Sequence, residues 1–312
     1  MAKSIIVTGA GAHVPFGMPT GLALREYILW LCGTHEIDGD SPFRRSDFRD
    51  MLTNRQLLAR LSTEFRNSQF PSIDAFLARN PDFADYGKGA IAATILGAED
   101  SDKILHQRNP GDWLGALITP LSDIDLDRLP DKLAFVTFNY DRCMEHWLYN
   151  HLRYGRKYSP EDAETWLQRL DITHVYGSVG TYVQEGPREG VCIGNSIDRH
   201  IFAAIDLLGI VAERAQQETV ERVQGLISKA LSLVFLGFAY DSMNISVLLG
   251  HMEHSQKIEL SRSLSFFGGT AMGMTKLEVD RSGLTELENF TVGGETQDCL
   301  AFVRTNRIAP GV

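Results

Sequence analysis

The chain has 312 residues, of which 44% are hydrophobic, 22% are charged and 9% are aromatic. This is the composition of a globular protein, and its length suggests about two domains. The formal net charge of −10 disfavours a protein whose main task is to bind nucleic-acid phosphates directly.

Membrane, secreted and zinc-ribbon proteins are also disfavoured. No run of about 18 or more apolar residues exists, so we expect no membrane span. The N-terminus lacks the apolar region and cleavage site of a signal peptide, which favours the cytoplasm. The cysteines are far apart and include no Cys-x-x-Cys pair, so we expect free thiols in a reducing compartment. They are Cys32, Cys143, Cys192 and Cys299.

The first unit of the chain is predicted to be a strand, a glycine turn and a helix. Ser4–Thr8 is a short run typical of a buried strand in a parallel sheet. The turn Gly-Ala-Gly follows, and residues 19–32 carry apolar side chains close to helical spacing. Residues 35–130 are more polar, with helical patterns and no convincing buried strand. We therefore expect a mostly helical insertion there.

The sheet is expected to resume at Lys132–Phe138, followed by a helix at about Arg142–Leu152. Residues 171–180 form the next predicted strand and turn, and residues 198–230 are again helical. Further strands are expected within residues 231–244 and 261–269 and near Leu300–Val303. The last 50 residues either complete the sheet or form a docking surface. This alternation predicts an α/β fold with a doubly wound, mostly parallel, Rossmann-like sheet.

The expected domain division follows from this order. A Rossmann-like domain is assigned residues 1–34, 131–197 and 231–312. A small helical domain, residues 35–130 and 198–230, is expected to pack over the ligand cleft.

Unusual residues follow four of the predicted strands, at Gly9–Gly11, Asn139–Asp141, His174–Gly180 and Gly237–Asn244. In an open parallel sheet the ligand lies beyond the carboxyl ends of the strands, where these residues meet. The glycine turn departs from the dinucleotide fingerprint, because Val14 stands where the third glycine belongs. An ordinary dehydrogenase is therefore disfavoured, and a tight turn without a ligand is the alternative.

The spacing of the glycine turn and the later Gly-x-Pro (Gly17 to Pro19) resembles the NAD-binding loop of sirtuins. "TFNYD" at residues 137–141 resembles their Thr-Gln-Asn-Ile-Asp motif, "HVYGS" at residues 174–178 their later His-Gly element, and "FLGFAYDSMN" at residues 235–244 the turn that faces the NAD ribose. The ordered set most resembles the sirtuin-like domains of bacterial antiphage proteins. The resemblance covers most of residues 1–250.

Three departures from the sirtuin pattern matter. Thr20, Gly21 and Leu22 stand where protein deacylases have Asp-Phe-Arg, and His13 replaces a serine. The four-cysteine zinc module is absent, so no zinc or other metal site is expected. Because that module supports the peptide cleft of deacylases, its absence argues against peptide deacylation and leaves NAD chemistry.

Two residues are expected to be catalytic. A neutral amide donates to and accepts from water and hydroxyls at once, which suits Asn139 for fixing the ribose or the attacking water. Its alternative role is an Asx turn that starts the next helix. His174 is expected to act as general base or to polarise a ribose hydroxyl. The alternatives are a satisfied core histidine at His174, and His13 as the base.

The remaining site residues are expected to bind NAD. Asp141 would bond the nicotinamide carboxamide, or cap the following helix. The glycine turn would direct backbone N–H groups at the pyrophosphate. Strand alternation places Tyr176 on the same face as His174, where it would line the pocket. Gly237 allows close backbone approach. Helix capping is the alternative role of Thr20, Asp241 and Asn244. The binding set is Gly9, Ala10, Gly11, Pro19, Thr20, Asp141, Tyr176, Gly237, Asp241 and Asn244.

The resemblance implies an NAD glycohydrolase that cleaves NAD to nicotinamide and ADP-ribose, or to a cyclic isomer. It implies an antiphage effector of the bacterial cytoplasm that depletes NAD, forms a homo-oligomer and is controlled by a nucleoside triphosphatase or an Argonaute-like protein. No direct nucleic-acid or membrane contact is expected. The alternatives are a non-catalytic sensor of NAD or ADP-ribose, and a deacylase or ADP-ribosyltransferase.

Overall fold

A computed structural model of the chain describes residues 3–33, 54–70, 72–106, 109–182, 193, 201–209 and 217–308. The strands form one six-stranded sheet in the order β3-β2-β1-β4-β5-β6, and every pair of neighbours is parallel. This is a Rossmann-like order, so the predicted fold class is confirmed. The strands are β1 Ser4–Thr8, β2 Leu133–Thr137, β3 Asp171–His174, β4 Ser232–Leu236, β5 Phe266–Gly269 and β6 Thr291–Val292.

Both faces of the central strands are buried. In β1, Ile5 and Val7 belong to one apolar cluster and Ile6 to another, because successive side chains point to opposite faces. Ile6 lies in register with Phe135 of β2 and Val234 of β4. A sheet with two buried faces needs strands that are apolar throughout, and this explains why the sequence signal was clear here.

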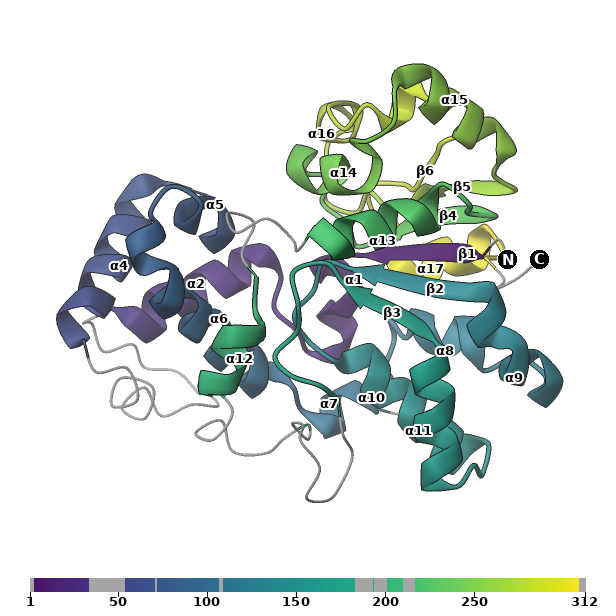
Figure 1. Cartoon of the computed structure of the whole chain (residues 1–312), viewed down its shortest axis with the longest axis horizontal. Coiled ribbons are helices and arrows are strands. Elements are labelled where there is room, and N and C mark those ends of the chain that lie inside the picture. Colours follow the sequence, from purple (N-terminus) through teal and green to yellow (C-terminus); the bar gives the residue numbers. More distant parts are fainter. Residues whose placement is uncertain are drawn as a thin grey trace.

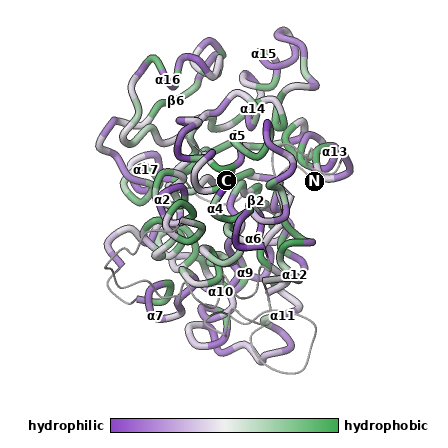
Figure 2. The backbone as a smooth tube through the Cα atoms, turned by 90° about the vertical axis from the view of Figure 1, so that its left-hand side faces the viewer, coloured by the Kyte–Doolittle hydropathy of each residue, from purple (hydrophilic) through white to green (hydrophobic). Residues whose placement is uncertain are grey.

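Helices cover both faces of the sheet (Figure 1). The cluster around Ile6 includes residues of α8, α9, α10, α11 and α17, and the cluster around Ile5 includes residues of α2, α6, α13 and α14. The helices of the first group are α8 Trp113–Ile118, α9 Asp123–Lys132, α10 Cys143–Asn150, α11 Pro160–Arg169 and α17 Cys299–Thr305. Those of the second are α2 Gly21–Cys32, α6 Ala84–Ala98, α13 Gln217–Ile227 and α14 Ser242–Leu249. Figure 2 shows hydrophobic segments inside the molecule and many hydrophilic segments in its outer helices.

A helical lobe extends from one side of the sheet (Figure 1). It consists of α2 and α6 with α4 Arg55–Ser68, α5 Ile73–Leu77 and α12 Ile201–Leu207, which contact one another. The other helices of the expected insertion lie elsewhere. Helices α8 and α9 pack on the sheet, and α7 Ser101–Ile104 contacts α10. The sequence segment 35–130 therefore contributes both to this lobe and to the sheet covering.

Polar side chains fix many of the helix starts. An oxygen of the residue before the helix accepts a hydrogen bond from a backbone N–H of the first turn, which would otherwise lack a partner. The capping residues include Thr20, Asn54, Ser72, Asp100, Asp112, Ser122, Ser159, Asp241, Thr275 and Asp298.

The last 50 residues complete the sheet. They include α15 His254–Ser263 in part, β5, α16 Lys276–Asp280, β6 and α17. The strand predicted near Leu300–Val303 is wrong, because these residues belong to α17. The Asp298 side chain caps that helix, and Phe302 and Val303 are buried on one side while Ala301 is exposed.

Two expectations from composition have structural outcomes. No helix among the described residues is long and apolar enough to cross a membrane. Cys32, Cys143 and Cys299 are buried and form no disulfide among the described residues, and Cys192 lies outside them.

Candidate functional site

The turns after β1 and β4 contact each other at the point where the strand order reverses. The Gly9 N–H donates to the Leu236 carbonyl and the Gly11 N–H donates to the Gly237 carbonyl, each over 3.0 Å. Gly237 has φ +56°, and a Cβ there would lie 1.9 Å from the Ala12 nitrogen. Only glycine fits this contact. The N–H groups of Gly9 and Gly11, expected to face a pyrophosphate, instead join two strand ends.

A cavity of about 670 Å³ lies beside this contact. Its walls belong to the turn after β1, residues 109–111, the turns after β4 and β5, and the start of α17. Phe238 and Met272 make its surface mostly apolar, and Thr270 and Asp298 supply polar groups. This size and lining are typical of a small-molecule site. Of the predicted binding residues, Gly11, Thr20 and Gly237 line it.

A smaller cavity, about 370 Å³, adjoins Val14 and Thr20, which line both spaces. Pro19 lies here, with the aromatic rings of Tyr27 and Trp30 on the α2 side. The Thr20 hydroxyl oxygen accepts from the Ala23 N–H over 3.2 Å, so its capping alternative is confirmed. The Gly-x-Pro segment therefore lines the smaller cavity and not the larger one.

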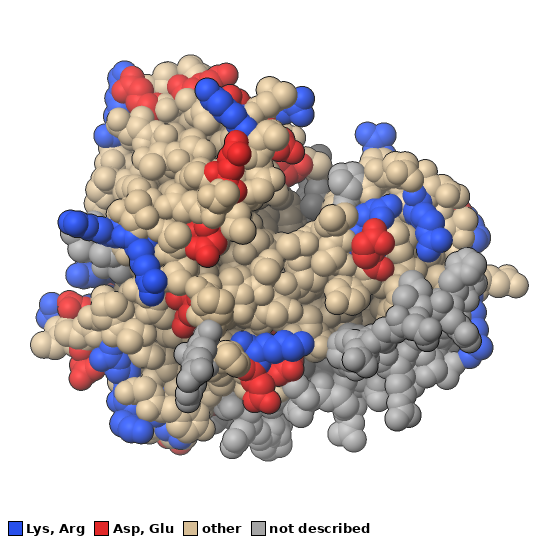
Figure 3. Space-filling model, turned by 180° about the vertical axis from the view of Figure 1, so that it is seen from behind, with Lys and Arg blue, Asp and Glu red and all other residues tan. Residues whose placement is uncertain are grey.

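The surface seen from behind is hollowed between the helical lobe and the part that carries α14 to α16 (Figure 3). Uncharged residues cover most of the surface around the hollow, and Lys, Arg, Asp and Glu side chains are scattered over the rest of this face.

Asn139 connects the turns after β1 and β2. Its side-chain Nδ2 donates to the Gly9 carbonyl over 3.1 Å, and its own N–H donates to the Thr137 hydroxyl over 3.1 Å. Asn139 is 7% exposed and does not line either cavity. The side chain therefore sits directly behind the glycine turn, where the larger cavity borders Gly11.

His174 lies next to Asn139, as the prediction of adjoining strand ends requires. Its Nδ1 is 2.9 Å from the Asn139 backbone oxygen, and its Nε2 is 2.8 Å from Glu145 Oε1. Burial lowers the pKa of His174, but the Glu145 charge and hydrogen bond, with smaller contributions from Asn139 and Asp141, raise it above its ordinary value. Glu145 was not among the predicted residues.

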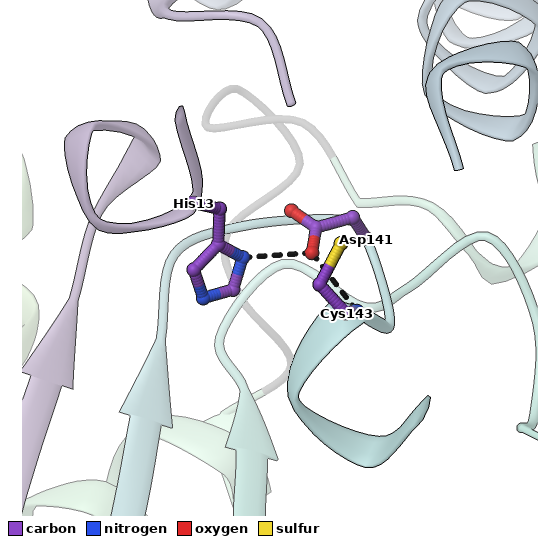
Figure 4. A group of neighbouring side chains, drawn as sticks. All are labelled: His13, Asp141 and Cys143. Atoms are coloured by element: carbon purple, nitrogen blue, oxygen red, sulfur yellow. Dashed lines mark hydrogen bonds and ion pairs between the residues drawn. The ribbon is translucent and has the colours of Figure 1, made fainter. Parts of the chain in front are cut away.

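His13 and Asp141 form a buried hydrogen-bonded pair (Figure 4). The His13 Nδ1 is 2.7 Å from Asp141 Oδ1, and this oxygen also accepts from the Cys143 N–H over 3.1 Å. The N-cap of α10 is Arg142, so Asp141 is not the predicted N-cap, although its carboxylate accepts from the N–H of the first helical residue. Burial raises the pKa of Asp141, but the attraction to His13 and the hydrogen bonds from His13 and Cys143 together lower it to about 2.

The same three side chains bring ligand-type atoms within 4.8 Å of one another. Burial and the nearby Asp141 raise the pKa of the Cys143 thiol well above its usual range, so a metal would have to displace this proton to bind the sulfur. The His13–Asp141 distance of 2.7 Å is that of a hydrogen bond between the two groups. We interpret the group as a hydrogen-bonded network.

Tyr176 lies away from His174. Strand β3 ends at His174, and Tyr176 belongs to the following turn, so the predicted alternation does not apply. The Tyr176 hydroxyl donates to Asn244 Oδ1 over 2.9 Å, and its ring packs edge-on against Phe138. Asp241 accepts from the N–H groups of Met243 and Asn244, which confirms its capping alternative.

Neither a protein-family model nor a curated protein sequence matches this chain.

The site thus has two parts. The larger cavity offers an apolar space at the reversal of strand order. Behind the glycine turn, the Asn139 amide and the His174–Glu145 pair supply a hydrogen-bonding amide and a group able to hold a proton.

Proposed function

We propose that the chain binds NAD in the larger cavity and hydrolyses its nicotinamide–ribose bond. One observation carries the proposal: the cavity lies at the reversal of strand order, bordered by Gly11 and Gly237, with Asn139 bonded to the same glycine turn. Ligands of open parallel sheets bind at this point. The ordered resemblance to sirtuin-like loops is the reason for proposing NAD as the ligand.

The chemistry requires few protein groups. Nicotinamide leaves as a neutral molecule, and water adds to the ribose, giving nicotinamide, ADP-ribose and one proton. Asn139 Oδ1 has no hydrogen bond to a described residue and is proposed to accept one from the ribose or from water. His174 is proposed to take the proton on Nε2, because its Nδ1 faces a carbonyl oxygen and therefore keeps its own proton.

The proposed biological role follows the same resemblance. The chain would deplete NAD in the bacterial cytoplasm as an antiphage effector, assemble as a homo-oligomer and be held inactive by a nucleoside triphosphatase or an Argonaute-like protein. Linear and cyclic products are both compatible with the proposed bond cleavage.

A second candidate is a non-catalytic sensor of NAD or ADP-ribose. It is favoured by the arrangement of the two proposed catalytic residues. Neither Asn139 nor His174 lines the cavity, and both nitrogens of the His174 ring already have partners. In this candidate, ligand binding alone would signal to a partner.

The test is to incubate purified protein with NAD, alone and with the product of the neighbouring gene, and to measure nicotinamide. The proposal expects release in at least one condition, and at least about a hundredfold less from Asn139→Ala with NAD binding retained, since the amide acts on the transition state. NAD binding without release in either condition would favour the sensor. Release that strictly requires an acyl-lysine peptide or an acceptor protein would favour a deacylase or an ADP-ribosyltransferase.

A further inference from the structure

Both ring nitrogens of His174 face hydrogen-bond acceptors. Nδ1 faces the backbone oxygen of Asn139 at 2.9 Å, and Nε2 faces the Glu145 carboxyl group at 2.8 Å. A backbone carbonyl has no proton to donate, so Nδ1 must carry one. The short contact between His174 Nε2 and Glu145 Oε1 then requires a second proton, which either the ring nitrogen or the carboxyl group carries. The pair therefore holds a proton at the nitrogen that the proposed hydrolysis needs as a base.

Glu145 is held in place by its position in the fold. It lies in the first turn of α10, and the His174 and Glu145 side chains are only 12% and 15% exposed. Its second oxygen, Oε2, is buried and has no hydrogen-bond partner among the described residues. Because Oε2 has no such partner, the orientation of the Glu145 carboxyl group depends on the contact of Oε1 with His174. Glu145 is therefore directed at His174 rather than shared among several partners.

The other charged groups near the pair are already engaged. Asp141 also acts on His174 through its charge, but its carboxylate is hydrogen-bonded to His13. Arg142, which is close enough to interact with Glu145, is bonded to Glu99 through its side chain. Cys143 lies in the same turn, and burial keeps its thiol protonated. Of the surrounding groups, Glu145 alone makes a direct ionic contact with the imidazole among the residues that the structure describes.

We propose that Glu145 is a positioning residue that holds His174 in its doubly protonated form and sets the pH above which His174 acts as a base. The mechanism is electrostatic, because the carboxylate favours the charged imidazole. This inference rests on the proposed function for its consequence in catalysis. The titration of His174 itself does not depend on any activity.

The experiment measures the titration of the His174 ring by NMR in protein labelled at histidine, with the signal assigned by its loss in His174→Gln. In Glu145→Gln, which keeps the shape and removes the charge, the midpoint should fall by at least about one pH unit. Glu145→Asp keeps the charge, so the His174 midpoint should fall less in this variant. Glu161→Gln is the control, because Glu161 is an exposed carboxylate in the first turn of α11, and its midpoint should match the wild type.

The pH profile of nicotinamide release supplies the second measurement. Its acidic limb should move to lower pH in Glu145→Gln, because His174 loses its proton more easily. An unchanged His174 midpoint in folded Glu145→Gln, or equal shifts in Glu145→Gln and Glu145→Asp, would overturn the inference. A shifted midpoint in a protein that binds NAD but releases no nicotinamide would overturn the proposed hydrolysis and, with it, the catalytic consequence of Glu145.

Discussion

Asp141 shows how a single buried carboxylate can join two strand-end turns. His13 reaches it from the end of α1 Ala10–His13, the short helix after β1, and Asp141 itself follows β2. Two buried side chains, 1% and 3% exposed, would be costly to desolvate without this pairing. This hydrogen-bonded pair therefore links the segment after β1 to the segment that carries Asn139.

The pairing predicts a pH dependence of stability. The folded pKa of Asp141 is lowered from 3.8 to about 2, so its contribution is present above pH 4 and is lost as the pH falls toward 2. A shift of this size corresponds to about 2 kcal/mol. Urea unfolding of Asp141→Asn and the wild type should show this difference at pH 6 and a much smaller one near pH 2.5. An Asp141→Asn deficit that stays constant over this range would contradict the prediction.

At the residue scale, sequence reasoning recovered part of the site. Asn139 and His174 were expected to meet because both follow parallel strands, and their contact confirms this placement. Glu145 was missed because it lies on a helix, where its direction depends on how α10 rotates against the sheet. Its only sequence signal is a carboxylate four residues after Asp141, in a first turn where acidic residues are common for helix capping and dipole reasons.

At the element scale, a buried ion pair joins α6 to the segment before α10. Glu99, at the end of α6, accepts from the Arg142 backbone N–H over 2.8 Å and from its Nε over 3.1 Å. Both side chains are 1% exposed. Helix α6 belongs to the helical lobe, so this pair connects the lobe to the turn that carries Asn139.

Removing one partner should destabilise the fold strongly. Glu99→Ala removes the carboxylate that is bonded to the buried Arg142 and should lower the free energy of unfolding by about 3–5 kcal/mol, measured by chemical denaturation. The matched control is Glu64→Ala, which removes the exposed Arg60–Glu64 pair on α4 and should cost less than about 0.5 kcal/mol. Equal losses of unfolding free energy in Glu99→Ala and Glu64→Ala would contradict the prediction that the buried pair contributes more than the exposed one.

The contact between the turns after β1 and β4 gives another prediction. Gly237→Ala puts a Cβ against the Ala12 nitrogen in a left-handed backbone, and it should lower the melting temperature sharply or prevent folding. Gly225→Ala is the control, because Gly225 lies in α13 with nothing near its Cβ position and should gain about 0.5–1 kcal/mol. A Gly237→Ala protein as stable as the wild type would contradict the described contact.

Sequence reasoning found elements where burial imposed a simple pattern. The strands β1, β2 and β4 lie between two apolar clusters and were visible as apolar runs. Strand β6 has two exposed residues, Thr291 and Val292, and offers no such run. The segment Leu300–Val303 is also apolar, but the Asp298 cap and burial on one side make it a helix. Short apolar runs do not separate these cases by periodicity alone.

At the scale of the whole molecule, one sheet positions both the larger cavity and the two proposed catalytic residues, Asn139 and His174. The reversal of strand order creates the larger cavity, and the parallel direction of the strands brings the turns after β1, β2 and β3 to one edge. Which side of the sheet each helix of residues 35–130 covers could not be predicted, because it depends on how helices pack across long sequence separations. We therefore propose that the cavity at this edge of the sheet is where NAD binds for cleavage.

The most direct test fills that cavity. Ala239 is exposed and lines it, so Ala239→Trp should abolish both NAD binding, measured by calorimetry, and nicotinamide release, without lowering the melting temperature appreciably. Ala78→Trp, an exposed position at the end of α5 that lines neither cavity, is the matched control and should retain both. A folded Ala239→Trp protein that binds and cleaves NAD like the wild type would contradict the account.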